Sequence, residues 1–142
     1  MPIIRCFHFK PDLPMSPILE SLSVICLCAE WCGVCRGYRA SFEEVGTGFP
    51  NCRFLWLDVE DDADVLGDID IENFPTLLIH NGTTILYFGV MLPYPSHLVR
   101  LLETFHELKD AERVTYAHAL PERRRWQEDL NLQAILRRFS GG

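Results

Sequence analysis

A short apolar run that leads directly into a Cys-X-X-Cys pair is the feature that most constrains how this chain folds. The run covers residues 22–28, and the pair is Cys32 and Cys35. A run of this length is typical of a buried central strand, and the pair behind it opens a helix. Cys32 is thereby predicted at the helix N-terminus, where unpaired N–H groups and the helix dipole stabilise a thiolate. Cys35, one turn further in, can then resolve a mixed disulfide formed at Cys32.

The length and composition of the chain fit one globular domain with room for an appendage. It has 142 residues, of which 48% are hydrophobic, and this is enough for a substantial core. No apolar run reaches the roughly 20 residues that a membrane span requires, and the N-terminus lacks a basic segment followed by a long apolar one. We therefore expect a cytoplasmic protein. Six cysteines are too few to indicate a disulfide scaffold, and in a reducing cytoplasm most of them would be free thiols.

Negative charge is concentrated in the first three quarters of the chain. Residues 1–106 hold 6 Lys or Arg against 14 Asp or Glu, a net charge of −8, whereas residues 107–142 hold 7 against 6, a net charge of +1. This distribution is not the footprint of a nucleic-acid-binding protein. Eight of the acidic residues fall between Asp58 and Glu72. Such a cluster is either a solvated acidic face or a surface that favours encounters with basic partners.

The order of predicted elements alternates strands with helices. The apolar patterns and turn residues predict, in chain order, a strand at 3–7, a short helix within 14–22, a strand at 24–28, a helix from 32 to about 45, a strand at 52–59, a short helix at 63–69, antiparallel strands at 76–80 and 84–88 around an Asn81-Gly82 turn, and a helix from Pro95.

This order, with Trp31-Cys32-Gly33-Val34-Cys35 after the second strand, resembles the thioredoxin family over residues 1–108. The segment Asn73–Gly82 extends the likeness, because an apolar residue there precedes a proline, a strand and a turn that contains glycine. The resemblance implies an α/β thioredoxin fold, with a central mixed sheet of four to five strands flanked by helices. It also implies that Pro75 is a cis-proline facing the dithiol.

The resemblance further implies thiol–disulfide exchange without a cofactor. Cys32 would be the attacking thiolate and Cys35 the resolving thiol. The residues that would shape the surface around the nucleophile or hold the client backbone are Trp31, Gly33, Phe74, Pro75 and Gly89. The implied partners are disulfide-containing client proteins and a reductase that recycles the enzyme.

Two further cysteines depart from the family pattern. Cys26 stands where typical thioredoxins have a buried aspartate, and Cys28 replaces a usual tryptophan. Residues i and i+2 of a strand face the same side, so both are candidate auxiliary thiols near Cys32 and Cys35. Two other interpretations remain: small hydrophobic core residues, or part of a four-thiolate metal site. Because no second Cys-X-X-Cys or His-X-X-X-His is present, we expect no bound metal.

Residues 109–142 exceed a single thioredoxin-like domain and are expected to form a helical C-terminal extension. Pro121 suits the first turn of a helix. The apolar residues that would share one face of this helix are Trp126, Leu130, Ala134, Ile135 and Phe139. This face could pack back on the parent domain or bind a partner or a second copy, so the oligomeric state stays open.

The sequence thus predicts a cytoplasmic protein-disulfide reductase, with a thioredoxin-like domain at 1–108, an extension at 109–142, and neither nucleic acid nor a membrane as partner. The alternative is a thioredoxin-fold adaptor or assembly chaperone that binds a partner protein while the dithiol plays little part. A reductase requires both Cys32 and Cys35, whereas partner binding by an adaptor should survive their replacement by serine.

Overall fold

The computed structural model describes residues 22–67, 69, 71 and 73–139. The strand predicted at 3–7 and the helix predicted within 14–22 lie outside these residues, apart from Leu22. The described strands are β1 (Ser23–Cys28), β2 (Arg53–Asp58), β3 (Thr76–His80) and β4 (Ile85–Val90). They form a mixed sheet in the order β2-β1-β3-β4, with β1 parallel to β2 and both other pairs antiparallel. The predicted fold class, a mixed sheet flanked by helices, is confirmed.

The central strand β1 is buried on both faces, as the apolar run predicts. All six of its residues are buried, and its side chains alternate between two separate cores. Cys26 and Cys28 point into one core, and Ile25 and Leu27 point into the other. This is the period-2 alternation of a strand that is covered on both sides. The two cysteines therefore share a face, as the sequence predicts.

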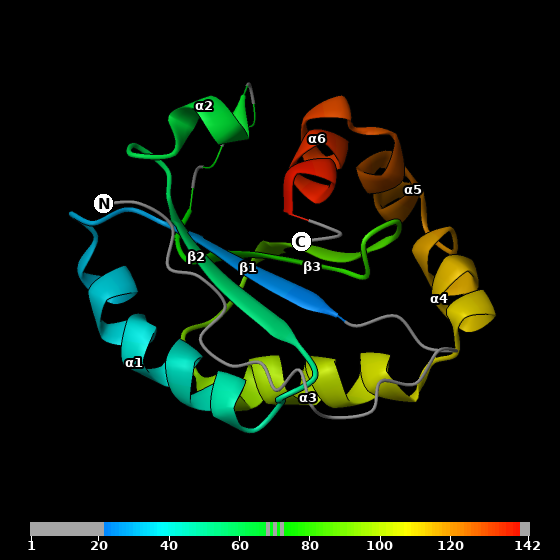
Figure 1. Ribbon diagram of the computed structural model, residues 1–142, viewed down its shortest axis with the longest axis horizontal. Helices are drawn as coiled ribbons and strands as arrows, with labels where there is room; N and C mark the ends of the chain where they lie inside the picture. Colours follow the sequence, from blue (N-terminus) through cyan, green and yellow to red (C-terminus); the bar gives the residue numbers. More distant parts are fainter. Residues whose placement is uncertain (1–21, 68, 70, 72, 140–142) are drawn as a thin grey trace.

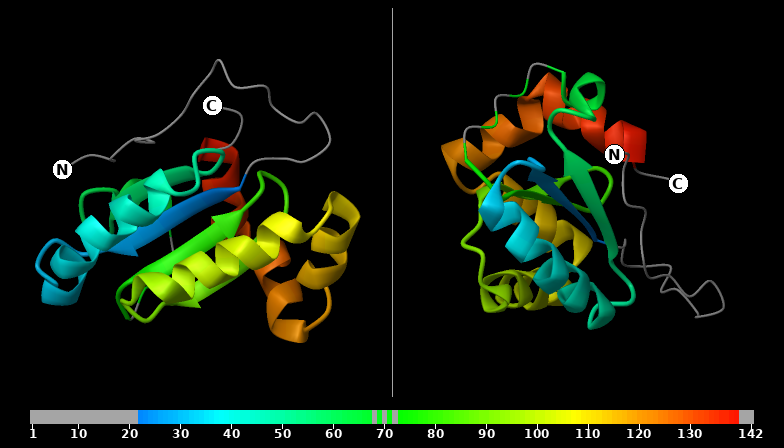
Figure 2. Two further views of the ribbon diagram at one scale, coloured as in Figure 1. Left: turned by 90° about the horizontal axis from the view of Figure 1, so that it is seen from below. Right: turned by 90° about the vertical axis from the view of Figure 1, so that its left-hand side faces the viewer.

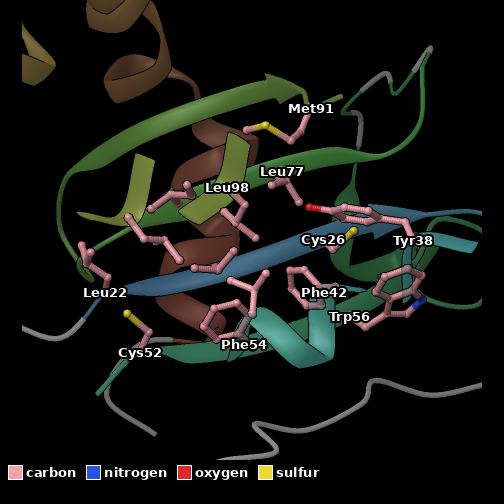
Figure 3. Packing of buried hydrophobic residues seen from close by; sticks show 14 of the residues in the cluster. Leu22, Cys26, Tyr38, Phe42, Cys52, Phe54, Trp56, Leu77, Met91 and Leu98 are labelled. Carbon is pink, nitrogen blue, oxygen red and sulfur yellow. The ribbon is translucent and has the colours of Figure 1, made fainter. Parts of the chain in front are cut away.

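Two helices cover the face of the sheet that carries Cys26 and Cys28. They are α1 (Gly33–Thr47) and α3 (Pro95–Glu107), and Figures 1 and 2 show both on the same side of the sheet. The apolar face of α1 buries Cys35, Tyr38 and Phe42. Figure 3 shows this packing, with Tyr38 and Phe42 directed toward the strands. Here α1 holds Cys35 in the core, directly against the strand that carries Cys28.

The other face of the sheet is covered by the C-terminal region. This region forms α4 (Asp110–Ala117), α5 (Pro121–Glu128) and α6 (Leu130–Phe139), and the short helix α2 (Ala63–Leu66) lies on the same face. The side chains of Leu132, Ile135 and Leu136 from α6 are buried in one cluster with Ile25 and Leu27 of β1. The extension therefore packs in cis, and α6 covers part of the second face of the sheet.

The apolar stripe predicted for this region is only partly right. The prediction assumed one helix from Pro121, but the helix is interrupted at Asp129. The Oδ1 atom of Asp129 accepts hydrogen bonds from the backbone N–H groups of Asn131 and Leu132 at 2.9 and 3.0 Å. This carboxylate satisfies free N–H groups at the start of α6. As a result Ile135 is buried and Trp126 is partly buried, whereas Ala134 and Leu130 are exposed, Leu130 to 80%.

The edge strand β4 is attached to α5 through one side chain. The Gln127 amide accepts a hydrogen bond from the backbone N–H of Ile85 at 2.9 Å and donates one to the Ile85 carbonyl at 2.7 Å. These are the two bonds that a neighbouring strand would make at that residue, so Gln127 blocks one position of an otherwise open sheet edge.

None of the helices in the described part of the chain has the length and apolar character that a membrane crossing requires.

Candidate active site

Cys32 lies at the start of α1, as the sequence predicts. Its backbone is extended, with φ −85° and ψ 121°, and its N–H donates to the Ala29 carbonyl at 3.0 Å. Its own carbonyl accepts the first hydrogen bond of the helix, from the N–H of Arg36 at 3.1 Å. Cys32 is therefore the N-cap residue, and its side chain is a partly exposed free thiol. A thiolate here would face the positive end of the helix dipole.

The disulfide of the structure joins Cys35 to Cys28. The sequence paired Cys35 with Cys32, but in the structure Cys32 is free and the Cys35 sulfur is bonded to the last residue of β1. Both bonded cysteines are almost fully buried, with 2% exposure for Cys35 and 1% for Cys28. This burial follows from their positions, because the inner face of α1 packs on the face of β1 that carries Cys28.

A third sulfur atom lies beside this disulfide. The Sγ atoms of Cys26 and Cys28 are 3.6 Å apart, and Cys26 is fully buried. Burial raises the pKa of the Cys26 thiol well above its ordinary value, so Cys26 stays protonated at neutral pH. Cys52 is also buried but lies elsewhere, with its sulfur 3.3 Å from Nε2 of His106 and its pKa raised by burial to about 12.

Aromatic groups border Cys32 on the side of β3. The Phe74–Pro75 peptide bond is cis, as the family resemblance implies. The rings of Phe74 and Trp31 meet edge to face with centroids 5.6 Å apart, and Phe74 and Cys32 pack against the same core cluster. The Trp31 indole N–H donates to Glu60 at 3.2 Å, which fixes the orientation of a ring that is 62% exposed.

Asp58 organises the loops that carry Cys32 and Trp31. It ends β2 opposite Cys28, and its carboxylate accepts backbone hydrogen bonds from Glu30 at 2.9 Å, Glu60 at 2.8 Å and Asp61 at 3.0 Å. The cluster of acidic residues predicted as a surface feature therefore includes a buried carboxylate with a structural task. Sequence reasoning missed this role. Its position directly after an apolar strand was the available signal.

A small cavity borders the Cys35 side of the site. Its volume is about 50 Å³, and its lining includes Cys35, Asp58, Trp56 and Arg39. A space of this size with several polar walls can hold water. Water held there would lie next to Cys35.

The two glycines of the predicted site take different positions. Gly33 is the first residue of α1 and is exposed, next to Cys32. Gly89 lies on β4 opposite Leu77, and a Cβ atom there would lie 3.4 Å from the hydroxyl of Tyr87. Tyr87 thus occupies the space beside Gly89 in this structure. Within the described residues, no group of three or more His, Cys, Asp or Glu side chains is arranged to hold a metal ion.

Comparisons with known proteins agree with this architecture. The family model described as thioredoxin matches residues 16–89. Thioredoxin of Equus caballus is 33% identical over 57 residues, which cover 40% of this chain and 54% of that protein. Thioredoxin H-type of Picea mariana is 37% identical over 59 residues, 42% of this chain and 47% of that protein. The chain thus spans about half the length of the curated relatives it matches. The solved thioredoxin of Trypanosoma brucei brucei superposes with a TM-score of 0.56 at 22% identity, covering 63% of this chain and 79% of that one, which shows the fold.

Proposed function

Because the chain belongs to the thioredoxin family, we propose that it is a thiol–disulfide oxidoreductase that reduces disulfide bonds in client proteins. The observation that carries this proposal is the position of Cys32, a partly exposed free thiol at the N-terminus of α1, next to the bonded pair of Cys28 and Cys35. A thiol in this position is favoured as a nucleophile, and the neighbouring sulfurs can take up the oxidising equivalents.

The reaction starts from the reduced enzyme, in which the Cys28–Cys35 bond has been opened, and proceeds in two exchange steps. The Cys32 thiolate attacks one sulfur of a client disulfide, so that a mixed disulfide forms and one client thiolate leaves and takes up a proton. The Cys35 thiolate then attacks the Cys32 sulfur, which releases the second client thiolate and forms a Cys32–Cys35 disulfide. The client gains two electrons and two protons, and the enzyme loses them. A reductase that supplies electrons from another thiol completes the cycle. We propose the cytoplasm as the compartment in which this protein works.

Exposed apolar side chains near Cys32 support a protein as the client. Trp31 and Val34 flank Cys32 in sequence and are 62% and 48% exposed. Val90 and Leu92 are exposed on either side of Met91, whose N–H donates to the carbonyl of Pro75 at 3.0 Å. Apolar surface that borders a reactive thiol is suited to an unfolded or extended client segment. In this proposal Phe74, Pro75, Gly33 and Gly89 complete the client surface.

Replacement of Cys32 by serine tests the proposal. With insulin as the disulfide substrate and dithiothreitol as the reductant, C32S is expected to lose the catalysed rate, because serine cannot form a disulfide. The matched control is C52S, which alters a buried thiol elsewhere in the core and should retain the rate. Full activity in C32S would refute the proposal. A partner protein whose binding survives both C32S and C35S would favour the adaptor alternative.

A further inference from the structure

We propose that Cys28 is a third redox residue of this site, which takes over the disulfide from Cys32 and Cys35 and returns Cys32 to the free thiol. This inference rests on the proposed function for its source of oxidising equivalents. The observation behind it is the pairing itself: Cys35 is bonded to Cys28 from β1, while Cys32 is a free thiol.

The backbone places Cys35 between two possible partners. Cys32 precedes it by one helical turn at the start of α1, and Cys28 faces it from the end of β1. The Cα atoms of Cys28 and Cys35 are 5.8 Å apart, a usual separation for a disulfide. Both elements are held by the packing of α1 on the sheet, so the bond forms without moving either backbone. One sulfur can therefore exchange between a surface partner and a buried partner.

The transfer step balances without an added oxidant or reductant. The Cys28 thiolate attacks the Sγ atom of Cys35 in the Cys32–Cys35 disulfide. The Cys28–Cys35 bond forms, the Cys32–Cys35 bond breaks, and Cys32 leaves as a thiolate. The proton that Cys28 gives up on becoming a thiolate is regained by the protein when Cys32 is protonated, and the number of disulfides stays at one.

Cys26 assists Cys28 as a positioning residue. While Cys28 is in the disulfide it carries no hydrogen, so in the 3.6 Å contact between the two sulfurs Cys26 donates its S–H. The same donor is in place to bond a Cys28 thiolate when the exchange runs in reverse. Burial raises the pKa of Cys26, so it keeps the proton that it donates.

The exchange separates storage of the disulfide from contact with clients. With the bond at Cys28 and Cys35, the oxidised pair is buried and the exposed sulfur is again a thiol. Attack of Cys32 on the Cys35 sulfur reverses the step and brings the disulfide back to the surface, where an external thiol reductant can reach it. Cys32 thus both delivers the disulfide to the buried pair and removes it again.

Fragment mapping of the full chain decides where the disulfide lies. The reduced protein is given excess insulin, quenched with acid, alkylated and cleaved after glutamate. Cleavage after Glu20, Glu30 and Glu43 places Cys26 and Cys28 together in fragment 21–30, and Cys32 and Cys35 together in fragment 31–43. The proposal expects the two fragments to be joined by a disulfide, with Cys26 and Cys32 alkylated and located by sequencing of the fragments; alkylation of Cys28 in place of Cys26 would overturn it. A disulfide contained within 31–43, with Cys28 alkylated, would overturn it.

Three serine variants sharpen the result. In C28S the joined fragments should be lost completely and the disulfide should stay within 31–43, whereas C52S should give the same joined fragments as the unaltered chain. C32S and the unaltered chain are both oxidised with oxidised glutathione. Dithiothreitol should then reduce the Cys28–Cys35 bond of C32S at least about ten-fold more slowly than that of the unaltered chain, because the exchange through Cys32 is missing. Equal rates would mean a static structural disulfide and would overturn the proposal.

The outcome is separable from that of the proposed function. If the unaltered chain reduces no insulin, the reductase proposal fails. The same fragment map is then made after oxidation with oxidised glutathione, and the position of the disulfide still decides the role of Cys28. Because the map needs only the unaltered chain, a C28S protein that fails to fold does not affect the decision.

Discussion

Burial divides the described cysteines into those that can meet a client and those that cannot. Cys32 is partly exposed, whereas Cys26, Cys28, Cys35 and Cys52 are each exposed by 2% or less. The sequence predicted the helix position of Cys32 and the shared face of Cys26 and Cys28. It could not predict which sulfurs are bonded, because that depends on how closely the first turn of α1 approaches the end of β1. Strand alternation fixes a side chain's face but not its distance from another element.

A buried neutral histidine makes stability depend on pH. His80 is fully buried, its Nδ1 accepts the N–H of Gly82 at 2.8 Å, and its Nε2 has no hydrogen-bond partner among the residues that the structure describes. Burial, with a smaller contribution from Arg53, lowers its pKa from 6.5 to about 4. The folded state therefore binds a proton less readily than the unfolded chain. The stability due to neutral His80 is complete above about pH 6.5 and falls as the pH drops toward 4.

We expect His80 to contribute about 2 kcal/mol to the loss of unfolding free energy between about pH 7.5 and pH 5. Urea denaturation at the two pH values measures it. In H80Q this part of the loss should disappear, whereas H118Q, which alters an exposed histidine, should behave like the unaltered chain. Equal pH dependence in H80Q and the unaltered chain would contradict the assignment.

A buried arginine ties α4 to the end of α3. Arg113 is 1% exposed, and its Nε and Nη2 both donate to the carbonyl of Phe105, at 3.3 and 3.1 Å. A cation here also opposes the negative end of the α3 dipole. R113A should therefore lower the free energy of unfolding by about 2 to 4 kcal/mol, through the unpaired carbonyl and the cavity that remains. R125A, on the exposed side of α5, should change it by less than about 0.5 kcal/mol in the same denaturation assay.

The secondary-structure elements were predicted best where local pattern and burial agree. The strand predicted at 76–80 is β3, and the helix predicted from Pro95 is α3. The C-terminal extension was predicted less well, because its periodic apolar residues continue past Asp129 and concealed the start of a new helix there. The hydrogen bonds of Asp129 to Asn131 and Leu132 mark that start, but an aspartate between two helical patterns is compatible with either one helix or two.

The turn after α2 requires glycine. Gly67 has φ 62° and ψ −128°, and a Cβ atom there would lie 2.9 Å from Oδ1 of Asn131 on α6. Residues other than glycine rarely adopt this conformation, so G67A should lower the free energy of unfolding by about 1 to 3 kcal/mol. G37A is the matched control. It places the same methyl group in α1, where nothing lies within 4 Å, and should raise stability by about 0.5 to 1 kcal/mol. Equal effects of the two substitutions in denaturation would contradict this account.

At the scale of the whole molecule, the C-terminal region packs on the second face of the sheet and buries its apolar side chains. Ile25 and Leu27 of the central strand, Leu78 of β3 and Ile85 of β4 are buried in one cluster with side chains of α6. The redox site lies on the opposite face, with α1 and α3. The residues that stabilise the fold through the extension are thus separated by the sheet from the residues that react.

The two sides of α6 should respond differently to substitution. Leu136 is 1% exposed within the cluster, so L136A should lower the free energy of unfolding by about 2 to 5 kcal/mol. Leu130 on the same helix is 80% exposed, and L130A should change it by less than about 0.5 kcal/mol. Urea denaturation and the native mass of both proteins provide the readout. A change from dimer to monomer in L130A would show that this surface is an interface between copies.

Cys28, Cys32 and Cys35 provide three sulfur atoms, and each disulfide uses two. No amount of oxidant can therefore pair all three among themselves. With the bond placed as in the structure, the unpaired atom is the one at the surface. Formation of this disulfide consequently does not remove the reactive thiol of the site. It leaves a single free thiol at Cys32, which can form a disulfide with a sulfur atom of another molecule.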